Sequence, residues 1–128
     1  MPIKKLLTVT SAVCVLSVLP MHSVQAHGDH GKPQFGGVIA EAGEIEMEIV
    51  GKNDTITVHL SIHGSPIDSA GATGKLTLLE GGKKSDLALT PAGANRMTAS
   101  GRYSAGTKLL LQVQLPGQKP LQARTIAK

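Results

Sequence analysis

Aromatic residues are nearly missing from the chain, which has no tryptophan, one phenylalanine and one tyrosine among 128 residues. Single-stranded nucleic acids are commonly held by bases that stack on aromatic side chains. Beyond Lys4 and Lys5, the basic residues are also spread from Lys32 to Lys128, whereas nucleic-acid-binding domains gather them on one face. The sequence therefore predicts no nucleic-acid partner.

Cysteine is equally scarce, and the single cysteine, Cys14, lies in an N-terminal segment with the layout of a secretory signal peptide. A basic start at Lys4 and Lys5 leads into an apolar run over residues 6–19, and a polar stretch ends at Ala26. This order of zones, with an A-x-A-like site at its end, is typical of a cleaved signal peptide. The run is shorter than the ~20 apolar residues that span a bilayer, so we expect no membrane anchor after cleavage.

Removal of residues 1–26 leaves a chain that begins at His27 and has no cysteine. Disulfides, thiolate metal sites and cysteine nucleophiles are thereby excluded from the mature protein. Loss of Lys4 and Lys5 lowers the 13 basic residues to 11, against 9 acidic residues, so the mature chain is only mildly basic. The signal peptide predicts a periplasmic location.

The mature chain, about 100 residues long, suffices for one domain with a modest core and is too short for two. Residues 27–36 are polar, glycine-rich and without hydrophobic periodicity, which predicts a short flexible tail that carries two histidines. Residues 37–128 hold alternating apolar patterns and turn motifs. We expect these residues to form a single β domain.

Period-two alternation marks two neighbouring strands. In residues 44–50, Ile45, Met47 and Ile49 alternate with glutamates, and in residues 55–63 apolar side chains alternate with threonine, serine and histidine. Such alternation is typical of half-buried strands. The apolar side chains of both strands are therefore expected to face one core.

The two strands can be paired through a four-residue loop at Gly51–Asp54. This register places Val50 opposite Thr55 and Glu46 opposite His59, and it keeps the apolar side chains together. A slip of one residue would turn every glutamate into the core. The sequence thus predicts a Glu46–His59 pair on the outer face of the hairpin.

Further strands are expected where apolar segments lie between glycine- and proline-containing turns. They cover residues 75–80, 85–90, 96–100, 107–115 and 121–127, with a short strand at residues 36–42. The pattern predicts an all-β protein, an immunoglobulin-like antiparallel β-sandwich of about seven strands. Tyr103 fits either a tyrosine corner whose hydroxyl bonds to backbone or a partly exposed turn residue.

The strongest metal-binding candidate is the new N-terminus. After cleavage, the α-amino group and imidazole of His27 form a chelate, His30 adds a second imidazole, and Asp29 can add a carboxylate. Nitrogen-rich ligand sets favour Cu(II), followed by other divalent metals such as zinc and nickel. The alternative is a polar tail that holds two histidines by chance.

Two strand histidines provide weaker candidates. His59, with Glu46 opposite, fits either a surface pair or a metal ligand, because opposed Cβ atoms lie about 4.5–5.5 Å apart. His63 is on the same face but roughly 13 Å further along the strand, so the two histidines are expected to act separately. The alternative for both is a solvated strand face.

Other chemistry has little support. Met47 is expected in the core, and two isolated methionines in different strands are a weak signal for copper(I). The sequence has no G-x-S-x-G nucleophile motif and no glycine-rich phosphate loop, and its glutamates alternate on an open strand. We therefore expect that the protein is not an enzyme.

Four segments of the chain resemble a known group of proteins. They are HGDHGKP (27–33), GGVIAEAGEIEMEIV (36–50), VHLSIHGSPIDSAGATGKLTLLEGG (58–82) and LTPAGANRMTASG (89–101). The chain resembles small periplasmic immunoglobulin-like proteins found with bacterial cobalt-zinc-cadmium and copper efflux systems, and it is similar to an accessory region of some efflux membrane fusion proteins. The resemblance implies metal handling through His27 and His30, with His59 and His63 as further ligands.

These observations predict a periplasmic accessory protein that binds copper, or zinc, cobalt or nickel, for an efflux or delivery system. The alternative is a metal-free interaction module that docks on an envelope protein or an efflux membrane fusion protein. A third interpretation, a copper oxygenase with an N-terminal histidine, is disfavoured by the small size of the chain and its lack of aromatics.

Overall fold

The computed structural model describes residues 31–128, so the predicted signal peptide and the tail ligands His27 and His30 lie outside it. The described residues form nine β-strands and no helix. The strands are β1 (Val38–Ala42), β2 (Ile45–Lys52), β3 (Thr55–Ile62), β4 (Ser65–Pro66), β5 (Thr73–Glu80), β6 (Lys83–Pro91), β7 (Arg96–Ser100), β8 (Lys108–Gln114) and β9 (Leu121–Ile126). The prediction of an all-β fold is confirmed.

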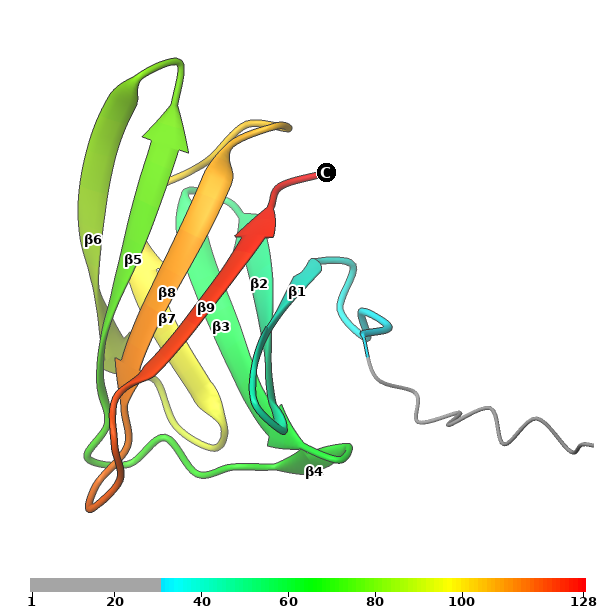
Figure 1. The fold of residues 1–128 in the computed structure, drawn as a ribbon, viewed down its shortest axis with the longest axis vertical. Helices are drawn as coiled ribbons and strands as arrows, with labels where there is room; N and C mark the ends of the chain where they lie inside the picture. The colour runs from blue at the N-terminus through cyan, green and yellow to red at the C-terminus, as the bar shows by residue number, and fades with distance from the viewer. Residues whose placement is uncertain (1–30) are drawn as a thin grey trace, which may run out of the picture.

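All strand pairs are antiparallel, in the order β1-β2-β3-β7-β6-β5-β8-β9, with β4 paired to β3. Strand β6 joins the two halves, because its residues 83–89 pair with β5 and its last two residues pair with β7. The sheet coils until β1 and β9, its two ends, come close to each other (Figure 1). The result is one antiparallel sheet nearly closed into a barrel.

The expected number of about seven strands is too low. Strand β1 is a regular strand with five residues paired to β2, and Ser65–Pro66 adds a two-residue strand on β3. Two residues are too few to produce an alternation pattern, so the sequence could not reveal β4. Within residues 31–128 there is no helix long and apolar enough to cross a membrane.

Tight two-residue turns connect several hairpins. Asn53 and Asp54 have φ angles of 52° and 59°, His63 and Gly64 of 49° and 79°, and Gly81 and Gly82 of 55° and 82°. Positive φ at both central residues is the requirement of the type I′ turn, whose twist matches that of the flanking strands. The dipeptides ND, HG and GG supply residues that tolerate this conformation.

The four-residue loop predicted between the first long strands is wrong. The turn consists of Asn53 and Asp54 alone, so Lys52 pairs with Thr55 and Glu48 pairs with His59. The observed register differs from the predicted one by two residues. Because side chains in a strand repeat every two residues, both registers keep apolar opposite apolar, and only the turn geometry distinguishes them.

The core lies inside the coiled sheet and is aliphatic. Met47 and Met97 are completely buried, which confirms the expectation that Met47 belongs to the core. Their neighbours in the core are mostly isoleucine, leucine and valine from β2, β3, β5 and β8. The core cluster itself contains no aromatic residue, and the unbranched, flexible side chain of methionine suits irregular gaps in such a core.

Tyr103 links the connection between β7 and β8 to strand β2. Its hydroxyl donates a hydrogen bond to the carbonyl of Ile49 at 3.3 Å, and a Cβ at Gly51 would lie 3.2 Å from its ring. Burial raises the pKa of Tyr103 above its ordinary value. The hydroxyl does bond to backbone, although the carbonyl belongs to a distant strand and not to a neighbouring residue.

Candidate functional site around Glu48 and His59

The outer face of the β2–β3 hairpin carries the carboxylates and histidine that the sequence singled out. In the observed register Glu48 lies opposite His59, and Glu46 lies opposite Ser61. The predicted Glu46–His59 pairing is therefore wrong, because the turn is two residues shorter than expected. Glu46 is a diagonal neighbour of His59, and diagonal Cα atoms lie about 7–8 Å apart.

Glu48 is a buried carboxylate, only 4% exposed, although it points away from the core. Residues 34–37, just before β1, cover it and donate three backbone hydrogen bonds. The N–H of Gln34 donates to Oε1 at 2.6 Å, and the N–H groups of Phe35 and Gly37 donate to Oε2 at 2.8 and 3.0 Å. Both oxygens are thus occupied, and Glu48 anchors residues 34–37 to the sheet.

Phe35 places its ring on the imidazole of His59. The ring centroids are 4.0 Å apart and the planes differ by 14°. Burial lowers the pKa of His59, an effect that Arg96 increases and Glu48 opposes. The lowered pKa favours the neutral imidazole. This form stacks on a phenyl ring without the cost of desolvating a charge, and it is also the form that binds a metal.

The anchored segment and the hairpin enclose a small hollow of about 140 Å³, whose lining is partly polar and partly apolar. Glu46, His59 and Ser61 line it from the sheet, Asn95 lines it from the turn before β7, and Lys32 lines it from the segment that precedes β1. The side-chain nitrogen of Asn95 donates to the carbonyl of Leu60 at 2.9 Å, so this amide is held in place. The hollow has polar groups in its wall and is large enough for water or a small ion.

His63 occupies a different environment, in the turn between β3 and β4. Its Nε2 lies 3.4 Å from Oε1 of Glu44, and the two side chains are 55% and 72% exposed. A contact this exposed contributes little to stability. His63 and His59 are not brought together, as the strand spacing predicted.

No three potential ligands among histidine, cysteine, aspartate and glutamate come together within the part of the chain that the structure describes. His27 and His30 precede that part. The metal role of these two residues, and that of His59, His63 and Glu46, stays a prediction.

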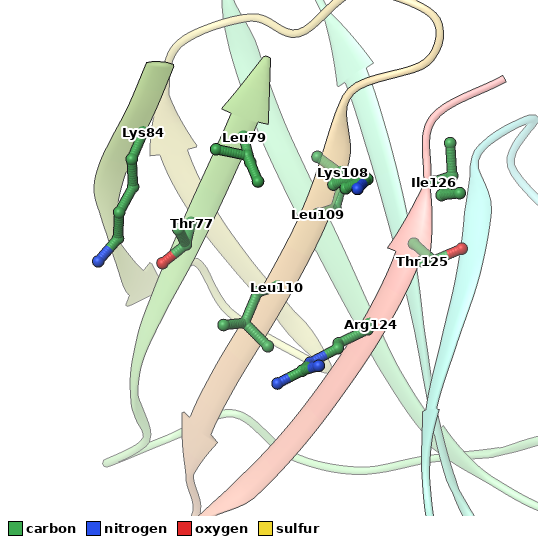
Figure 2. A pocket seen from close by; sticks show the side chains of 9 residues that line it. All are labelled: Thr77, Leu79, Lys84, Lys108, Leu109, Leu110, Arg124, Thr125 and Ile126. Carbon is green, nitrogen blue, oxygen red and sulfur yellow. The ribbon is translucent and has the colours of Figure 1, made fainter. Parts of the chain in front are cut away.

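The structure also contains a surface hollow that the sequence did not predict. It lies on the outer face of strands β5, β6, β8 and β9. An apolar hollow of about 570 Å³ opens there, and we call it the outer hollow (Figure 2). Leu79, Leu110 and Ile126 supply apolar surface, and Lys84, Lys108 and Arg124 supply charge. A signal was present: consecutive leucines at 78–79 and 109–111 must send some side chains outward, because successive side chains of a strand point to opposite faces.

The chain matches no protein-family model, and no curated protein or solved structure is significantly similar to it. The resemblance to efflux-associated proteins stays a prediction from the sequence, and function is argued below from this chain's own residues.

Proposed function

We propose that the protein is a periplasmic accessory that binds a divalent transition metal, copper before zinc, cobalt or nickel, for an efflux or delivery system. His27 supplies the α-amino group and an imidazole, and His30 supplies a second imidazole. Nitrogen donors of this kind place Cu(II) first in the divalent affinity order. The predicted signal peptide, cleaved after Ala26, generates the essential amine.

The observation that carries the proposal is the anchoring of residues 34–37 by Glu48. His30 is four residues from Gln34 and His27 is seven, so at ~3.3–3.6 Å per residue both are within about 25 Å of the anchor. The anchor lies beside His59. The tail ligands can therefore reach the neutral imidazole of His59.

Glu48 is not a ligand in this proposal, because its oxygens accept three backbone hydrogen bonds. Glu46, which lines the same hollow as His59, is the carboxylate that can support a metal there. His63 is too exposed and too far along the hairpin to join this site, and it remains a separate, weaker ligand.

The strand pairing supports an immunoglobulin-like arrangement behind this site. Strand β3 pairs with β7 in one half of the sheet, β5 pairs with β8 in the other, and β6 changes partner between them. Two halves packed over one core, with a strand that passes from one to the other, are typical of sandwich domains. Such a domain would present the tail to an efflux membrane fusion protein or another envelope protein.

Native mass spectrometry of protein recovered from the periplasm tests the proposal. The expected result is a mass that begins at His27 and retains one copper ion after addition of one equivalent of Cu(II). The double variant His27→Ala, His30→Ala should lose the copper. The matched control His63→Ala should keep it, because that imidazole lies in a separate turn.

A start at another residue, or a wild-type protein that retains no metal, would contradict the proposal. Binding that is unchanged at about pH 5 would also contradict it, since protons compete with metal for the amine and the imidazoles. The variant His59→Ala tests whether the strand imidazole binds the metal together with the tail ligands. A weaker but stoichiometric copper complex in that variant would support the participation of His59.

The alternative function, a metal-free interaction module, is favoured by the outer hollow, because exposed apolar hollows on small domains are commonly binding surfaces. Under this alternative the domain docks on an envelope protein or an efflux adaptor. The His27→Ala, His30→Ala variant separates the two functions, since it should abolish metal uptake and leave docking intact.

A further inference from the structure

The outer hollow has a regular arrangement that follows from the strand register. Across one row of the sheet, Lys84 pairs with Leu79, Leu79 with Lys108, and Lys108 with Ile126. In the next row, Thr77 pairs with Leu110 and Leu110 with Arg124. Cationic and apolar side chains thus alternate on one face, and they point toward the same side of the sheet (Figure 2).

The apolar part of this face is unusually open to solvent. Leu79 is 40% exposed and Ile126 is 56% exposed, and they are two of the three large apolar side chains exposed within residues 31–128. Leu109, at 1% exposure, belongs to the core on the opposite face of the sheet. Apolar surface gathered in one hollow, in a domain that otherwise buries its aliphatic residues, points to an apolar ligand.

The charged side chains around the hollow indicate the charge of the ligand's polar end. Lys84, Lys108 and Arg124 come from three different strands and bring three positive charges to its rim. The carboxylate adjacent in the register is Asp86, opposite Thr77, and it accepts a hydrogen bond from the Thr77 hydroxyl at 2.6 Å. The balance remains positive, so an anionic group is attracted.

We propose that the outer hollow binds a single-chain amphiphile with an anionic head group, of the chemical class of a long-chain fatty carboxylate. The alkyl chain lies on Leu79, Leu110 and Ile126, and the head group pairs with Arg124 or Lys108. The volume of about 570 Å³ falls within the range of small-molecule sites. This site is separate from the proposed metal site and does not depend on it.

An extended peptide that binds by adding a strand to the sheet fits the hollow less well. Extended peptides gain affinity by adding backbone hydrogen bonds at a free sheet edge, whereas strands β5 and β8 are each paired on both sides. A bilayer surface also fits less well, since a flat surface leaves the floor of a concave hollow unfilled. An alkyl chain needs no hydrogen bonds and can follow the hollow.

The test is a titration of the folded full-length mature protein, labelled with ¹⁵N, with octanoate, decanoate and dodecanoate below their critical micelle concentrations. Amide shifts should be confined to β5, β6, β8 and β9. Affinity should rise about fourfold for each added methylene until the hollow is filled, as expected for burial of hydrocarbon. A dodecyl chain with a trimethylammonium head group should bind at least about tenfold more weakly than dodecanoate.

Two variants test where the head group and the alkyl chain of the ligand bind. Arg124→Glu should weaken dodecanoate binding about tenfold. The control Lys75→Glu, on β5 and on the same face of the sheet but outside the hollow, should leave binding unchanged. Ile126→Ser should flatten the dependence on chain length. Both altered hollow residues are exposed, so circular dichroism should show an unchanged fold.

Shifts that fall outside these four strands, affinity that is independent of chain length, or equal binding of the cationic amphiphile would overturn the proposal. Binding to anionic phospholipid vesicles without any binding of monomeric dodecanoate would also overturn it and would indicate a membrane-docking face. Loss of copper retention in the tail variant has no bearing on this site, so failure of either proposal can be recognised independently.

Discussion

The phenyl ring of Phe35 stacks on the imidazole of His59 with centroids 4.0 Å apart and planes 14° apart. One residue of the N-terminal segment thus covers the histidine that the sequence marked as a metal candidate. The backbone N–H of the same Phe35 donates to Glu48, the residue opposite His59. Phe35 therefore holds the start of the described chain against His59, the proposed strand ligand.

Replacement of Glu48 tests the anchor directly. In Glu48→Gln the amide oxygen can replace Oε2, but the amide nitrogen then faces the N–H of Gln34, so a donor meets a donor. We expect the free energy of unfolding to fall by roughly 2–4 kcal/mol, because buried hydrogen bonds to a charged group are lost and a buried donor is left unpaired. Urea denaturation measures this change.

The control for Glu48 is Glu44→Gln, which alters an exposed carboxylate at the end of the same hairpin. It should change the free energy of unfolding by less than about 1 kcal/mol. Hydrogen exchange at Gln34, Phe35 and Gly37 should accelerate in Glu48→Gln only. Equal stability of the two variants would show that Glu48 does not anchor the segment.

The pH dependence of stability reports on His59. Burial lowers its pKa in the folded protein below the ordinary value of 6.5, so the unfolded chain takes up the proton first as the pH falls. Stability that is present at neutral pH is therefore lost progressively below about pH 6.5 and down through the folded pKa. The groups that flank this imidazole are Glu48 and Arg96.

The variant His59→Phe keeps a ring against Phe35 and removes the titration. Thermal unfolding at about pH 7.5 and about pH 5.5 should show a larger loss for the wild type than for His59→Phe. His63→Asn removes the imidazole in the exposed turn and tolerates its φ of 49°, so it serves as the control and should lose as much stability between the two pH values as the wild type. Identical pH dependence in all three proteins would refute the expected effect of burial.

Met97 tests whether the two buried methionines are core residues or metal ligands. Met97→Ala should lower the free energy of unfolding by about 2–5 kcal/mol, because a fully buried side chain leaves a cavity. Met97→Leu conserves most of the volume and should cost less than about 1.5 kcal/mol. Copper retention by native mass spectrometry should be unchanged in Met97→Leu, and its loss would indicate thioether ligation.

The turn at Asp54 tests the register of the β2–β3 hairpin. Asp54 has a φ of 59°, so Asp54→Val should cost about 1–2 kcal/mol, whereas Asp54→Gly should be neutral or stabilising by up to about 1 kcal/mol. The side chain of Asp54 also pairs with the exposed Arg102. Arg102→Ala removes that pair alone and should change stability by less than about 1 kcal/mol. Equal effects of valine and glycine would contradict the two-residue turn.

Several elements of the fold were predictable because their signal is local. The alternation of Ile45, Met47 and Ile49 with glutamates requires a strand with one buried face, and the same pattern located β3. Glycine- and proline-containing segments marked the turns. The placement of Met47 in the core followed from the same alternation.

The candidate site was only partly predictable. The sequence indicated that His59 would face a carboxylate across the hairpin, but it chose Glu46 instead of Glu48, because a register shift of two residues leaves the hydrophobic pattern unchanged. Nothing local to Glu48 distinguishes it from Glu44 or Glu46. Its burial depends on the backbone of residues 34–37, which reaches it from another part of the chain.

The sequence by itself therefore determined the all-β class of fold, the strands with strong alternation and the lack of cysteine in residues 31–128, because these depend on residue type and on spacing along the chain. Only the tertiary structure decided which glutamate faces His59, that Phe35 covers it, and that Leu79, Leu110 and Ile126 share one hollow with three cations. Those relationships join strands that are distant in sequence, and they are fixed by turn geometry and by the coiling of the whole sheet.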